Sequence, residues 1–170
     1  CVEHLGQGLQ RFGRPEQLGG GLGPGSYAGW RIAIASALGL RSATGAKLAG
    51  IPSICALDVE VGEYGVVGDA RRQSFFFARV KDARLIEGPI LESASELDTR
   101  LKELALVIYA SELLPQFPLA TQAYPVAGRL AQFAREHAGE IHDAQVLEPI
   151  YLREPHITVP RAQNVIVPTL

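Results

Sequence analysis

The stretch Gly19-Gly20-Gly21-Leu22-Gly23-Pro24-Gly25-Ser26-Tyr27-Ala28-Gly29-Trp30-Arg31 joins a glycine-dense segment directly to an apolar helical pattern. Six of the eighteen glycines of the chain lie within it, so glycine is concentrated here rather than spread along the sequence. Because glycine has no Cβ, it lets the backbone adopt positive φ or come close to another surface. We therefore expect this segment to pack tightly against something else.

A helix is predicted from Ser26, a good N-cap residue, to about Ala43. Apolar residues occur on nearly all sides of this helix, which predicts burial on most of its circumference. Gly29, Ala33 and Ala37 repeat every four residues and leave one face without bulky side chains. Another helix can approach that face closely, and the spacing alone fits packing within one domain as well as contact with another subunit.

Shorter elements are predicted on both sides of this helix. Helical spacing marks residues 5–12, and strands are expected at Leu18–Leu22 and Lys47–Ile51. Ser53 follows Pro52 and is expected to cap a short helix that reaches Val61. Gly62 and Gly65 then mark a break, which is the best candidate boundary between two lobes.

The second half of the chain alternates strands with helices. A meander of three strands is predicted, with Arg71-Arg72-Gln73 in its first turn, at Val66–Asp69, Ser74–Val80 and Leu85–Leu91. Ser93-Ala94-Ser95-Glu96 fits a capping box and predicts a helix to about Leu104. A buried strand at 105–110 and a helix with Pro125 at its first position, ending near Gly139, complete an α/β pattern with a mixed sheet.

Composition limits the classes of function. The chain has 170 residues, 47% of them hydrophobic and 20% charged, which is typical of a globular protein. Its net charge of −2 leaves no basic footprint for unaided nucleic-acid binding, so any RNA role is expected to be shared with a partner. Ile32–Leu40, the longest weakly polar run, is too short to span a membrane, and the sequence does not open with a signal-peptide pattern.

Cys1 and Cys55 are too few for a disulfide framework or a cysteine zinc site, which indicates reduced thiols and a cytoplasmic location. The sequence contains no methionine, even at position 1. We therefore expect that an N-terminal segment, or the methionine positions of the translated product, are not included in it.

The glycine loop does not match three motifs that bind phosphate, bind a dinucleotide or carry a nucleophilic serine. A P-loop needs a lysine followed by Ser or Thr, and no lysine lies near Ser26. Residues 23–28 fit G-x-G-x-x-A, but a dinucleotide site also needs an acid about 20 positions further on, and the first acid is Asp58. A G-x-S-x-G nucleophile elbow would need glycines at Pro24 and Ala28, so Ser26 is better explained as a helix cap.

The remaining candidates are histidines and one aspartate. No two of the four histidines are spaced i, i+4, so no helix face presents a metal pair, and all are expected on the surface: His4, His137, His142 and His156. Asp69 ends an apolar strand beside Arg71 and Arg72, where α/β proteins hold ligands. An aspartate that stabilises its own turn explains the same residues. The residues alone assign no catalytic and no metal-binding side chain.

Taken together, four segments resemble one family. Residues 23–31 resemble the Gly-Pro-Gly-Ser-Phe-Thr-Gly-hydrophobic-Arg signature of the bacterial TsaB (YeaZ) family, and Gly50-Ile51-Pro52-Ser53-Ile54-Cys55-Ala56-Leu57 resembles its Gly-Val-Ser-Ser-Leu-x-Ala-Leu segment. Asp69-Ala70-Arg71-Arg72 is similar to its Asp-Ala-Arg-Arg turn, and Pro149-Ile150-Tyr151-Leu152-Arg153 to its closing segment. The segments occur in the family's order from about residue 15 to 153.

The resemblance implies a two-lobed α/β fold of the actin/Hsp70-like (ASKHA, ribonuclease H-like) type, with mixed sheets flanked by helices. Its lobes would be residues 1–62 and 63–153, followed by a tail at 154–170. The family begins with a hairpin that carries an Asp-Thr-Ser-like turn, which this sequence lacks, so the first lobe is expected to be N-terminally incomplete.

The resemblance also implies a role in making threonylcarbamoyladenosine on tRNA. In the family, also labelled glycoprotease-like, this subunit is non-catalytic and pairs with itself or with a catalytic TsaD-type subunit, joined by a TsaE-type ATPase. Such a chain would bind no cofactor alone, with ATP or ADP possible at the complex interface, and would reach tRNA only through the complex. The implied partner interface is Gly25, Ser26, Gly29, Trp30, Ala33 and Ala37.

The implied loop motif is Gly23, Pro24, Gly25, Ser26, Gly29 and Arg31, with Asp69, Arg71 and Arg72 on a ligand side. Two alternatives stay open from the sequence. One is an independent nucleotide-dependent kinase or peptidase of the same fold, and the other is a homodimeric interaction protein.

Overall fold

The computed structural model describes residues 13–25, 27–137 and 147–153. Its elements, in chain order, are β1 (Gln17–Gly21), α2 (Tyr27–Thr44), β2 (Lys47–Ile51), the 3-10 helix η1 (Ser53–Ala56), β3 (Glu63–Asp69), β4 (Ser74–Lys81), β5 (Arg84–Ser93), α3 (Ala94–Glu103), β6 (Val107–Ala110), β7 (Thr121–Gln122) and α4 (Ala127–Glu136). The helix expected at residues 5–12 lies outside the described residues.

The strands form two sheets. β1 and β2 pair in parallel, and the larger sheet has the order β5-β4-β3-β6-β7. β3, β4 and β5 are antiparallel neighbours, as the predicted meander requires, whereas β6 pairs with β3 in parallel and β7 with β6 in parallel. The mixed α/β architecture predicted from the sequence is confirmed.

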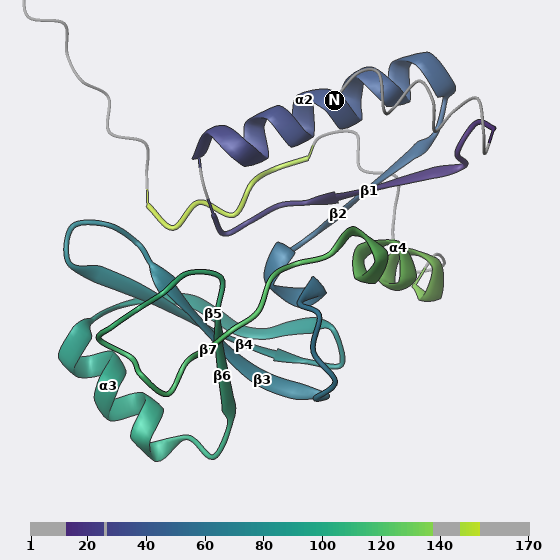
Figure 1. The fold of residues 1–170 in the computed structure, drawn as a ribbon. Coiled ribbons are helices and arrows are strands. Elements are labelled where there is room, and N and C mark those ends of the chain that lie inside the picture. The colour runs from purple at the N-terminus through teal and green to yellow at the C-terminus, as the bar shows by residue number, and fades with distance from the viewer. Residues whose placement is uncertain (1–12, 26, 138–146, 154–170) are drawn as a thin grey trace, which may run out of the picture.

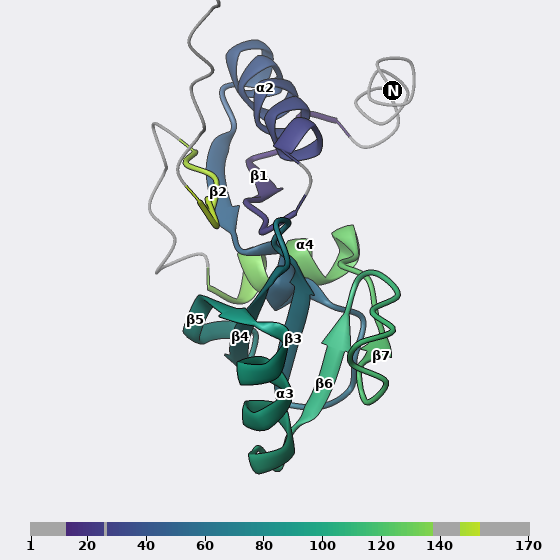
Figure 2. The same cartoon turned by 90° about the vertical axis from the view of Figure 1, so that its left-hand side faces the viewer.

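The two sheets lie at opposite ends of the molecule in Figures 1 and 2. α2 lies beside β1 and β2 at one end, and α3 lies against the five-stranded sheet at the other. α4 contacts β1 and η1 at the junction between them. β1, α2 and β2 therefore build one end of the molecule, and β3 to β7 with α3 build the other, with η1 and α4 between them.

β3 and β4 are buried on both faces of the larger sheet. Because side chains alternate along a strand, even-numbered and odd-numbered residues enter different cores. One core faces η1 and α4 and contains Tyr64, Val66, Phe76, Ala78 and Val80. The other faces α3 and contains Val67, Phe75, Phe77, Leu97, Leu101 and Ile108.

Two glycines of β3 make room for aromatic rings on these faces. A Cβ at Gly65 would lie 2.6 Å from Ile108 Cδ1 and 3.1 Å from the Phe77 ring, and a Cβ at Gly68 would overlap the Phe76 ring. Gly65 therefore belongs inside β3 and does not mark the chain break that the sequence suggested. The glycine is required there by the close approach of Phe77, which is fully buried.

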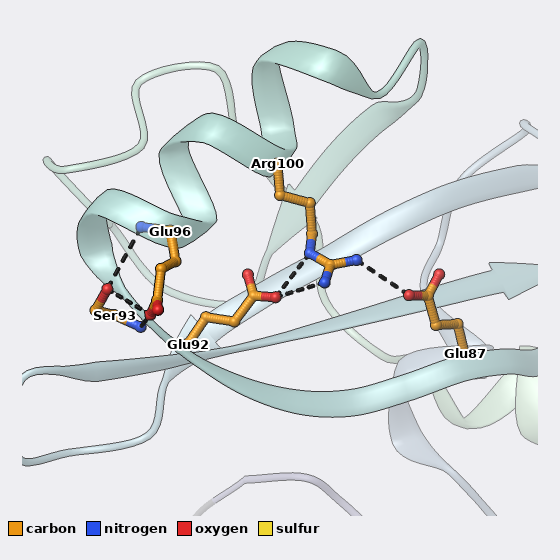
Figure 3. A network of polar contacts seen from close by, with 5 residues as sticks. All are labelled: Glu87, Glu92, Ser93, Glu96 and Arg100. Carbon is orange, nitrogen blue, oxygen red and sulfur yellow. Dashed lines mark hydrogen bonds and ion pairs between the residues drawn. The ribbon is translucent and has the colours of Figure 1, made fainter.

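α3 begins with the predicted capping box. The Ser93 side chain accepts the Glu96 N–H, and the Glu96 carboxylate accepts the Ser93 N–H at 2.9 Å. Figure 3 shows how Arg100 then ties the helix to β5: its Nε donates to Glu92 Oε1 at 2.8 Å and its Nη1 to Glu87 at 3.1 Å. The guanidinium also lies over the Phe77 ring, 5.3 Å from the centroid. Hydrogen bonds to Glu92 raise the pKa of Arg100 and keep it charged.

α2 has the predicted bounds, but the predicted burial is wrong. None of its described side chains is buried, and Ile32 and Leu38 are 67% and 41% exposed. The reason is the narrow sheet beneath it, because two strands can cover only one stripe of a helix. No helix within the described ranges is long and apolar enough to cross a membrane.

One predicted helix end and one predicted helix start are also wrong. Leu57 forms a β-bridge with Pro125, so η1 ends at Ala56 instead of continuing to Val61. The same bridge holds Pro125 in extended backbone, and α4 begins after Val126. The residues next to Leu57 or Pro125 could not predict this bridge, because the two partners are far apart in the sequence.

Gly65→Ala should destabilise the fold by about 1–3 kcal/mol, because its methyl group would displace Phe77 and Ile108. Gly128→Ala is the matched control: it lies in α4, nothing lies within 4 Å of its Cβ position, and it should gain up to about 1 kcal/mol. Urea unfolding followed by circular dichroism measures both. Equal stability of the two variants would contradict the packing argument.

Candidate functional site

A cavity of about 620 Å3 lies at the end of β3. Its wall combines the glycine loop, the β3–β4 hairpin, the residues after β6 and the last described segment. The residues are Pro24, Gly25, Ile54, Val67, Gly68, Asp69, Ala70, Arg71, Arg72, Phe76, Ser111, Glu112, Ile150, Tyr151, Leu152 and Arg153. A cavity of this size matches those that bind small organic ligands.

The cavity brings together two predicted groups of residues that are far apart in the sequence. Pro24 and Gly25 of the loop motif line the same cavity as the predicted ligand-side residues Asp69, Arg71 and Arg72. Gly29 and Arg31, also in the loop motif, lie on α2 and are exposed. The side chains of Ser26 and Trp30 lie outside the described residues.

The β3–β4 hairpin has an unusual backbone. Arg71, Arg72 and Gln73 have φ of 64°, 54° and 59°, which is the left-handed region that residues with a Cβ rarely adopt. Each such residue costs about 1–2 kcal/mol. Asp69 offsets this cost, because its carboxylate accepts the Arg71 N–H at 2.6 Å and lies 3.4 Å from Arg71 Nη1. Asp69 thus stabilises its own turn and also lines the cavity.

Two further segments are fixed to this hairpin. Glu112, which follows β6, accepts the Asp69 N–H at 2.9 Å. Arg153 donates to Ser74 Oγ at 2.5 Å, and the Ile150 N–H donates to the Leu22 carbonyl at 2.9 Å. The segment 150–153 therefore connects the glycine loop to the hairpin across the cavity.

Sequence reasoning missed Ser111 and Glu112 as cavity residues. A signal was available, since both directly follow an apolar strand, and strand ends in α/β folds are where ligand-contacting residues gather. What the sequence did not give was the pairing of β6 beside β3, which brings Glu112 to Asp69.

Two hydrogen bonds connect Gly23 to Ser53, the first residue of η1. The Gly23 N–H donates to Ser53 Oγ at 3.1 Å, and the Ser53 N–H donates to the Gly23 carbonyl at 2.7 Å. Ser53 was predicted to cap the short helix, but its hydroxyl makes no capping bond and serves the glycine loop instead. Gly23 has φ of 90° and is buried, and a Cβ at Gly21 would lie 2.5 Å from the same hydroxyl. These glycines serve close packing.

The partner-interface residues on α2 are accessible where they are described. Gly25, Gly29 and Ala33 are exposed, and Ala37 is half-buried. Accessibility alone does not identify a partner, so the interface stays a prediction.

Neither Cys55 nor His137 looks catalytic. Burial raises the pKa of the Cys55 thiol to about 12, so the nucleophilic thiolate is scarce at neutral pH. His137 stacks on Phe133 with its Nδ1 3.0 Å from the Phe133 carbonyl oxygen. His4, His142 and His156 lie outside the described residues, and within those residues no group of three His, Cys, Asp or Glu side chains could hold a metal ion.

The fold and cavity define a class: a mixed α/β protein with a five-stranded sheet flanked by helices and an arginine-lined cavity at a strand end. Two solved structures share this fold. YeaZ from Pseudomonas aeruginosa superposes with a TM-score of 0.65 over 88% of this chain and 83% of its own, at 17% identity. A Pseudomonas aeruginosa protein described as uncharacterized, with similarity to peptidase YEAZ, gives 0.67 over 89% and 82%, at 22% identity.

Curated relatives are found in mycobacteria. An uncharacterized protein of Mycobacterium leprae is 32% identical over 149 residues, which are 85% of this chain and 40% of that protein. An uncharacterized protein of Mycobacterium tuberculosis is 35% identical over 79 residues, 46% of this chain and 37% of that protein. The chain thus spans well under half the length of these relatives, and no family model matches it.

Ser53→Ala should destabilise the fold by about 1–3 kcal/mol, because the buried Gly23 N–H would lose its acceptor. Ser42→Ala, at an exposed position of α2, is the control and should change stability little. Thermal unfolding of both variants measures the difference. If Ser53→Ala unfolds at the same temperature as the control, the hydroxyl does not hold the loop.

Cys55 should react slowly with iodoacetamide at pH 8 in the folded protein, since its thiol is buried and protonated there. A Cys1→Ser background leaves Cys55 as the only thiol. Denaturation in urea should accelerate labelling at least tenfold, as followed by mass spectrometry. Fast labelling without denaturant would show that the η1 region opens readily.

Proposed function

We propose that this chain is a non-catalytic, TsaB (YeaZ)-type subunit of the complex that forms threonylcarbamoyladenosine on tRNA. The observation that carries the proposal is the fold shared with YeaZ over most of both chains. The four sequence segments support it as well, since each of them contributes residues to the wall of one cavity: residues 23–31, 50–57, 69–72 and 149–153.

In this proposal the chain scaffolds a TsaD-type catalytic subunit and works beside a TsaE-type ATPase in the cytoplasm. It forms homodimers when alone and meets tRNA only within the complex, with ATP or ADP held at the complex interface. Residues 1–62 and 63–153 are its two ASKHA-like lobes.

The surface that suits the partner is the outer face of α2. Ile32, Ser36 and Gly39 follow helical spacing on that face and are exposed, and Ala33 lies next to them. Small side chains let a second helix approach closely, and the exposed Ile32 supplies apolar area to bury. Among the described residues, α2 contacts β1 and β2, and Ile32, Ala33 and Ser36 stay exposed, which suits the approach of a helix from another subunit.

Ala33→Trp should abolish association, because an indole would separate the two helices. Ala131→Trp, at an exposed position of α4, is the matched control and should associate like the wild type. The measurement is co-purification of the full chain with the TsaD-type protein of the same organism, together with the molar mass of the chain alone in light scattering.

Two results would contradict the proposal at different levels. If the wild-type chain does not bind the catalytic protein, and its depletion leaves threonylcarbamoyladenosine in tRNA unchanged, the function is wrong. If Ala33→Trp binds as the wild type does, only the α2 interface is wrong.

A further inference from the structure

The cavity at the end of β3 carries an excess of positive charge. Three arginines line it, Arg71, Arg72 and Arg153, against the two carboxylates of Asp69 and Glu112. Both carboxylates are engaged by the protein itself. Asp69 accepts the Arg71 N–H and pairs with its guanidinium, and Glu112 accepts the Asp69 N–H.

Arg72 stands apart from these contacts. Its side chain is exposed at the cavity wall and, among the residues that the structure describes, nothing accepts a hydrogen bond from its guanidinium or its backbone N–H. Arg153 uses one N–H for Ser74 Oγ, and a guanidinium has five such donors. Arginine guanidinium groups bind phosphate oxygens through charge-assisted, often bidentate hydrogen bonds.

The opposite part of the cavity is apolar. Ile54, Val67 and Phe76 are core residues that also reach the cavity wall, and Ile150 and Leu152 add to it from the last described segment. A bare inorganic anion would leave this surface unused. A ligand that carries both a phosphate and a hydrophobic or aromatic group would use the whole cavity, whose volume of about 620 Å3 suits such a molecule.

We propose that this cavity binds an organic phosphate monoester, with its phosphate held by Arg72 and Arg153 and its organic part against Ile54, Phe76 and Leu152. The site belongs to this chain alone and does not depend on the subunit role proposed above. This ligand site differs from the expectation, drawn from the sequence, that the chain by itself binds no cofactor. The calorimetric titration described next tests the site and that expectation together.

Isothermal titration calorimetry of the full chain with four probes tests the proposal: adenosine monophosphate, ribose 5-phosphate, inorganic phosphate and adenosine. We expect saturable binding of at least one ester, at least tenfold tighter than inorganic phosphate, and none of adenosine. Tighter binding of the nucleotide assigns the organic part to a nucleoside, and equal binding assigns it to a sugar.

Arg72→Gln should weaken ester binding tenfold or more, because it removes a charged hydrogen-bond donor. Arg135→Gln removes the same charge from an exposed position of α4, away from the cavity, and should leave the affinity unchanged. Arg153→Gln gives a second, independent variant, and circular dichroism confirms that each is folded.

Three results would overturn the site. One is the absence of saturable binding for both esters at millimolar concentration. Another is inorganic phosphate binding as tightly as the esters, which would leave the apolar wall without a role. The third is an equal loss of affinity in Arg72→Gln and Arg135→Gln, which would reflect net charge only.

Discussion

The structure depends on β3 and β4 being packed on both faces at once. Because their side chains alternate, β3 and β4 contribute residues to two hydrophobic cores, one toward η1 and α4 and one toward α3. Gly65 and Gly68 remove a Cβ on opposite faces, so that Phe77 can enter one core and Phe76 the other. Neither glycine is there for a turn. Each glycine leaves the space that an aromatic ring of the neighbouring strand β4 occupies.

This packing also places the cavity. Phe76 belongs to the first core and lines the cavity, so the wall of the site is an outward edge of the core. The hairpin that follows β3 then turns back through three left-handed residues, a conformation that Asp69 and the contacts of Glu112 and Arg153 hold together. Strain of this kind persists only where surrounding structure supports it.

Local signals in the sequence were sufficient for most elements. The Ser93–Glu96 capping box and the alternating pattern of β3 to β5 are read from neighbouring residues, and both are confirmed. Long-range pairing was not readable in the same way. The Leu57–Pro125 bridge ends one helix and delays another, and β6 brings Glu112 to Asp69. The exposure of α2 was missed because composition reports apolar residues but not the width of the sheet they face.

The glycine loop connects the two surfaces that carry the proposals. Pro24 and Gly25 line the cavity, α2 begins two residues later at Tyr27, and Gly23 is anchored to Ser53 on the inner side. The cavity wall and the start of α2 are therefore neighbours in one short segment, and the Gly23 anchor precedes both. Because this anchor holds the segment at its N-terminal end, the tight turn that leads into α2 also shapes the cavity wall at Pro24 and Gly25.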